Sequence, residues 1–73
     1  MNDDEPIETP DDVLRKKVAL LRQEHQDVSA SIEALAAQPL PDQLLIARLK
    51  RKKLALKDEI LRLEAHILPD IIA

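Results

Sequence analysis

The 73-residue sequence contains no glycine, no cysteine and no aromatic residue, and each absence excludes a class of site. Without glycine, no loop has the bare backbone that wraps a phosphate, which excludes Walker-type and dinucleotide-binding motifs. Without cysteine, there is no disulfide, thiolate zinc site or thiol nucleophile. Without aromatic rings, there is no stacking platform for single-stranded nucleic acid. We therefore predict that the chain is not an enzyme and holds no cofactor or metal.

Long apolar runs are also missing, since no stretch reaches the roughly 18 residues that a membrane span needs. The N-terminus is acidic, the opposite of the basic start of a secretory signal. We therefore expect a cytoplasmic protein with no membrane partner. The net charge of -3 is unevenly distributed, because residues 1–12 hold acids and no base, whereas all 11 lysines and arginines follow them.

Prolines divide the chain into two helical segments. Thr9 and Pro10 form a typical helix start. The Thr9 hydroxyl can accept a hydrogen bond from a free backbone amide of the first turn. Pro10 lacks a backbone N–H, but at the first helical position that N–H would have no partner within the helix. Pro39 and Pro41 interrupt the helical pattern, and Pro69 ends it. The predicted segments are a disordered acidic leader (1–9), a helix (10–38), a turn (39–41), a second helix (41–68) and a tail (69–73).

Each predicted helix has an apolar seam with alternating steps of three and four residues, which is a heptad pattern. In the first helix the seam is Leu14, Val18, Leu21, His25, Val28, Ile32 and Leu35. In the second it is Ile46, Leu49, Lys53, Leu56, Ile60, Leu63 and Ile67. If the helices fold back on each other, facing residues pair in layers whose residue numbers add to one constant total. The sequence therefore predicts an all-α fold, an antiparallel two-helix hairpin of coiled-coil type in one register.

One hairpin buries too little apolar surface to offset the entropy of ordering its residues. We therefore expect self-association into a dimeric four-helix bundle. Ala47 and three leucines recur every seven residues outside the seam of the second helix, and the first helix adds Val13 and another leucine. The predicted association face consists of Leu20, Leu54, Leu61 and Leu68. The alternative is that these are scattered surface leucines.

Two polar residues interrupt the seams. His25 faces Leu56 in the predicted layers, and Lys53 faces Val28. We interpret both as structural residues that specify the register, with Lys53 paired to Asp27 or Glu24 across the interface. A metal site at His25 shared between subunits and a catalytic role for Lys53 are alternatives, but neither has the converging partners that such chemistry requires.

A basic cluster follows in the second helix and suggests another function. Its members are Arg48, Lys50, Arg51, Lys52, Lys53 and Lys57. A stretch this basic can bind the phosphate backbone of nucleic acid. At 100° per residue, however, the six side chains surround the helix instead of gathering on one face. A nucleic-acid-associated protein is therefore the alternative to a protein-interaction role.

Particular residues also resemble a known family. The run Leu21-Arg22-Gln23-Glu24-His25, then Ile46-Ala47-Arg48-Leu49-Lys50 and Lys53 to Ile60, is similar to the signature of the YdcH-like family of small bacterial proteins. The resemblance implies a short helical hairpin in the bacterial cytoplasm, with no known function and no active site to carry over. Taken with the residue analysis, it predicts a small, self-associating, non-catalytic interaction or adaptor protein whose protein partner and cellular role are unknown.

Overall fold

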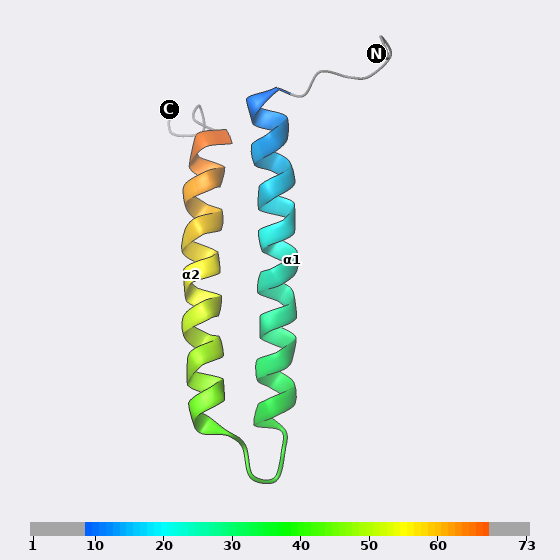
Figure 1. Ribbon diagram of the computed structural model, residues 1–73, viewed down its shortest axis with the longest axis vertical. Helices are drawn as coiled ribbons and strands as arrows, with labels where there is room; N and C mark the ends of the chain where they lie inside the picture. The colour runs from blue at the N-terminus through cyan, green and yellow to red at the C-terminus, as the bar shows by residue number, and fades with distance from the viewer. Residues whose placement is uncertain (1–8, 68–73) are drawn as a thin grey trace.

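The computed structural model describes residues 9–67, which form two α-helices joined by a short loop. Helix α1 spans Pro10–Ala36 and helix α2 spans Gln43–Ile67. The helices run antiparallel and side by side, with the loop at one end of the pair (Figure 1). The predicted all-α hairpin is confirmed. Residues 1–8 and 68–73, which include most of the predicted leader and all of the predicted tail, lie outside the described residues.

Helix α1 begins with a capping box, in agreement with the predicted helix start. The backbone amide of Asp12 donates to Thr9 Oγ1 and the backbone amide of Thr9 donates to Asp12 Oδ2, each at 3.2 Å. Pro10 follows as the first helical residue, where its missing N–H costs nothing. Hydrogen bonding with the Thr9 backbone lowers the pKa of Asp12 below its ordinary value of 3.8, and hydrogen bonding with the Thr9 side chain lowers it further.

The loop between the helices is built without glycine. Helix α1 ends at Ala36, two residues before the predicted end, because the proline at 39 keeps Gln38 out of the helical region. Ala37 is the C-cap at φ -79° and ψ -9°, and its N–H still bonds to the carbonyl of Glu33. No residue within 9–67 has a positive φ, so the turn avoids the left-handed cap for which glycine is favoured.

Helix α2 begins at Gln43, two residues later than predicted. Asp42 is the reason, because it acts as the N-cap in place of a helical residue. Its Oδ1 accepts the backbone N–H of Leu45 at 3.0 Å, and its carbonyl accepts that of Ile46 at 3.0 Å. Pro41 therefore lies just outside the helix, and the side chain of Asp42 satisfies a donor that would otherwise lack a partner.

The core lies along the predicted seam. Every seam residue of both helices is buried or half-buried. The buried ones are Val18, Val28, Ile46, Leu56, Ile60 and Ile67. No side chain in the described part of the chain is fully enclosed, so the core is one residue thick. Neither described helix has an apolar stretch long enough to cross a membrane.

Three ion pairs between the helices agree with the predicted register. Lys17 Nζ lies 3.9 Å from Glu59 Oε1, and Lys52 Nζ lies 3.1 Å from Glu24 Oε2. When the two residue numbers of each pair are added, these two pairs give the same total, which is lower than the total of the seam layers. Arg22 also pairs with Glu64. The residue numbers of this third pair add to a total that is higher than that of the seam layers by the same amount. Ion pairs displaced equally to either side are what two opposite flanks of one antiparallel seam produce.

Candidate functional site

The hairpin has two flanks with different charge. The paired flank, defined by the Lys17–Glu59 and Glu24–Lys52 bridges, matches each base with an acid across the seam. The basic flank, on the opposite side, contains Arg22–Glu64 and continues along α2 in steps of seven to Lys57 and Lys50. On this flank only Glu64 supplies a bridge between the helices within residues 9–67.

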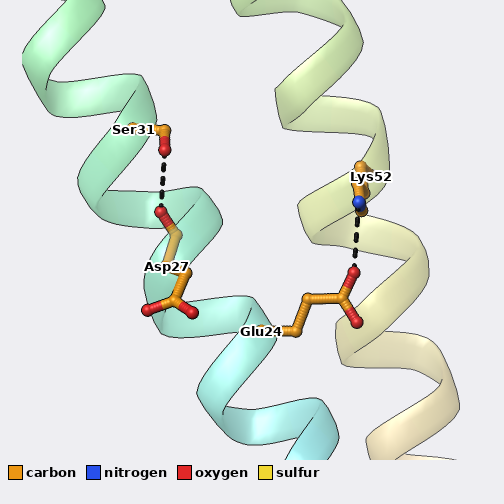
Figure 2. Close-up of polar contacts among 4 residues, drawn as sticks. All are labelled: Glu24, Asp27, Ser31 and Lys52. Carbon is orange, nitrogen blue, oxygen red and sulfur yellow. Dashed lines mark hydrogen bonds and ion pairs between the residues drawn. The ribbon is translucent and has the colours of Figure 1, made fainter.

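The two acids predicted as partners of Lys53 are engaged with other residues. Glu24 points toward Lys52, and the carbonyl of Asp27 accepts a hydrogen bond from Ser31 Oγ at 3.0 Å (Figure 2). The Asp27 carboxylate accepts another from Gln23 Nε2, also at 3.0 Å. The predicted pairing of Lys53 with Asp27 or Glu24 is therefore wrong, because Lys53 lies on the groove of the opposite flank.

A groove of about 490 Å³ lies on the basic flank. Its lining comes from both helices and consists of His25, Ile32, Lys50, Lys53, Leu54 and Lys57. The groove follows from the small residues on α1. Continuing in steps of seven from the Arg22–Glu64 pair, Ser29 comes opposite Lys57 and Ala36 opposite Lys50. These side chains are short, which leaves room for a hollow on this flank beside the seam.

The groove has a strongly positive rim. Lys50, Lys53 and Lys57 follow one another at spacings of three and four residues, which places them along one ridge of α2. Such like charges repel each other on an isolated helix. No acid among the described residues forms an ion pair with any of the three. The repulsion along this ridge is therefore not offset by a carboxylate of the described hairpin.

His25 lines the same groove. Its Nε2 is buried and has no hydrogen-bond partner, and it is the one such side-chain atom within residues 9–67. The ring is half-buried in the seam beside Leu56, which is buried as the predicted layer requires. Buried polar atoms normally find a partner. No group of three or more histidine, aspartate or glutamate side chains that could hold a metal ion occurs within the described ranges. The unsatisfied nitrogen therefore belongs to a ring that lines a groove shared with three lysines.

The predicted basic cluster does not form one surface. Lys50 and Lys57 lie together at the groove with Lys53. Lys52 is on the paired flank, bound to Glu24. The other members, Arg48 and Arg51, project from α2 about 100° or more around the axis from the three groove lysines. The structure thus separates the cluster into a groove-lining half and a dispersed half.

The predicted association residues are also divided. Leu54 and Leu61 are 62% and 54% exposed and share one face of α2, beside the basic flank. Leu20 is 72% exposed but lies within about 60° of Lys17 around α1, on the side of the paired flank. Leu68 lies outside the described residues. Leu20 therefore lies on a different surface from Leu54 and Leu61.

A second hollow, of about 240 Å³, lies on the basic flank nearer the open end of the hairpin. Its lining consists of Arg15, Val18, Arg22, Glu64 and Ile67. Here Glu64 neutralises Arg22, unlike the larger groove, whose lining includes no acid. The larger groove is therefore the stronger candidate site. Sequence reasoning missed it, although lysines at 50, 53 and 57 facing small residues at 29 and 36 give a readable signal.

Comparison with known proteins agrees with this hairpin. A family model described as a protein of unknown function, DUF465, matches residues 19–64, which include most of the seam and the whole larger groove. The chain belongs to the DUF465 family. The resemblance to YdcH-like proteins is confirmed, since these are members of DUF465. No curated protein and no solved structure matches this DUF465 chain.

Proposed function

We propose that this DUF465 hairpin is a non-catalytic interaction module of the bacterial cytoplasm that associates with a second copy of itself through α2 to form a four-helix bundle. The observation that carries the proposal is the exposure of Leu54 and Leu61, at 62% and 54%. These residues are seven apart, so their side chains lie on one face about 10 Å apart along the helix. Ala47 extends the stripe by a further seven residues.

The thin core supports the same proposal. A two-helix seam in which no described side chain is fully enclosed provides little burial against the cost of ordering two long helices. Packing the α2 stripe against its copy would add apolar burial where the single hairpin has none. Closed two-fold pairing is the simplest arrangement that satisfies both chains. Other exposed surfaces, including the one around Leu20, are then left for a protein partner.

Sedimentation of matched leucine variants tests the association. The unmodified chain should sediment as a dimer at micromolar concentration. The L61E variant should sediment as a folded monomer with a lower melting temperature, because a carboxylate is costly to bury without a partner. The control is L20E, which makes the same change at a more exposed leucine on the other flank and should preserve the dimer. A folded monomer for the unmodified chain, or dissociation by L20E but not L61E, would contradict the proposal.

Nucleic-acid binding is the second function that the sequence suggests, and the lysine ridge at 50, 53 and 57 is the observation in its favour. Against it, Lys52 is paired with Glu24 and Arg48 and Arg51 project to other sides of α2, so the six bases of residues 48–57 do not gather on one surface. Titration of a short DNA duplex at rising salt tests this function, since phosphate contacts make affinity fall steeply with salt. The variant K50E/K57E should then abolish binding, whereas R48E/R51E should retain it. Equal binding by all three chains would exclude the lysine ridge as the nucleic-acid site.

A further inference from the structure

We propose that the larger groove is a binding site for a small amphipathic anion, an anionic head group attached to a short hydrocarbon chain. The head group contacts Lys50, Lys53 and Lys57, and the chain lies over Ile32 and Leu54. One hairpin forms this site without a second copy, although Leu54 belongs both to the groove lining and to the proposed association face.

The charge of the groove selects an anion. Three lysines line one hollow, and no carboxylate of the described residues forms an ion pair with them. Elsewhere between the helices, the bases at 17, 22 and 52 each have an acid across the seam. A bound head group would provide the missing counter-charge. It would also relieve the repulsion among lysines spaced three and four residues apart.

His25 adds a directional polar contact. Its Nε2 is buried without a partner, in a ring that lines the groove. The outer torsion of a histidine side chain is broad, so a modest turn of the ring presents this nitrogen to an oxygen in the hollow. A hydrogen bond there would satisfy the orphaned atom, which otherwise costs stability.

Size and apolar lining favour a small amphiphile over a long polyanion. The lysine ridge covers seven residues, or about 10 Å of helix. The volume of about 490 Å³ is within the roughly 300–1,000 Å³ typical of small-molecule sites. Ile32 and Leu54 provide apolar contact along this length. A nucleic-acid backbone would use the lysines but would leave this apolar surface without a matching group.

Titration of octanoate, followed by calorimetry and by the imidazole NMR signals, tests the site. The sequence contains two histidines, and His66 is exposed in the last turn of α2, so it serves as an internal reference. Octanoate should shift the His25 signals in a saturable way and leave those of His66 in place. Octanol and inorganic phosphate, each carrying half of the required chemistry, should bind more weakly than octanoate.

Charge variants locate the binding. K50Q/K57Q should weaken octanoate binding about tenfold through loss of two charged contacts, and its melting temperature without ligand should rise because like charges are removed. The matched control R48Q/R51Q makes the same change in net charge outside the groove and should bind as the unmodified chain does. Circular dichroism checks that both variants are helical. The titration is repeated on L61E, which should retain octanoate binding and thereby separates this site from the association face.

Several results would overturn the proposal. Octanol binding as tightly as octanoate would show that the charge plays no part, and phosphate binding as tightly would show the same for the apolar lining. An equal loss in R48Q/R51Q would indicate a general charge effect. A DNA duplex that shifts the His25 signals and is not displaced by octanoate would identify a polyanion site instead.

Discussion

The first residues of α1 show how a local hydrogen-bond pair sets where a helix begins. Thr9 and Asp12 satisfy each other's backbone amides, next to the positive end of the helix dipole. The lowered pKa of Asp12 means that the folded state favours the ionised carboxylate. The stabilisation from ionised Asp12 is therefore complete above its ordinary pKa of 3.8 and disappears as the pH falls through the lower, folded value.

Thr9→Ala should lower the melting temperature by about 2–5 °C at neutral pH, because the capping hydroxyl is lost. Thermal melts by circular dichroism at pH 7 and in acid measure this effect. In the unmodified chain the contribution of Asp12 should disappear only in the acid range below 3.8. The variant D12N, which cannot ionise, should lack that part of the acid dependence. Identical acid profiles for D12N and the unmodified chain would contradict this account of the cap.

His25 and Lys53 are the two polar residues of the seam, and both reach the groove. Replacing both with leucine should raise the melting temperature by about 4 °C or more, since an orphaned buried atom is removed and apolar burial is added. The same variant should form a wider range of oligomers, because polar seam residues reject wrong alignments. Thermal melting and analytical ultracentrifugation measure the two effects. A less stable variant that remains a single species would indicate that the pair makes specific favourable contacts.

At the scale of the helices, the sequence allowed most of the hairpin to be predicted. Prolines and heptad spacing located both elements, and seam burial followed the predicted layers. The helix ends differed by two residues because Asp42 caps α2 and Gln38 precedes a proline. The groove could not be predicted from the seam alone. It depends on which flank each charge occupies, and on Ser29 and Ala36 being short at the places where lysines face them.

The bridge between Glu24 and Lys52 provides a prediction at this scale. K52E should lower the free energy of unfolding by about 0.5–1 kcal/mol, because it places two carboxylates together across the seam. Exchanging the charges in E24K/K52E should restore most of the loss, since the pair is re-formed in reverse. Denaturant unfolding of the single and double variants measures the coupling. No recovery in the double variant would mean that the two side chains do not interact in solution.

At the scale of the whole molecule, the thin core connects folding to association. If a second copy covers the α2 stripe, the folded state gains stability by mass action. The melting temperature of the unmodified chain should therefore rise with protein concentration. L61E should melt at a lower temperature that does not change with concentration, and L20E should behave as the unmodified chain. A concentration-independent melt for the unmodified chain would indicate that one hairpin is stable alone.

The flanking ion pairs also determine the alignment of the two helices. An apolar heptad seam cannot distinguish its own alignment from one displaced by seven residues, because each heptad returns the same face. The charges can distinguish them. A displacement in one direction would bring Lys17 opposite Lys52, and in the other Glu24 opposite Glu59, so bridges present in the native alignment would become repulsions. The alignment of the two helices is thus encoded twice, coarsely by apolar fit and finely by the sign of charge.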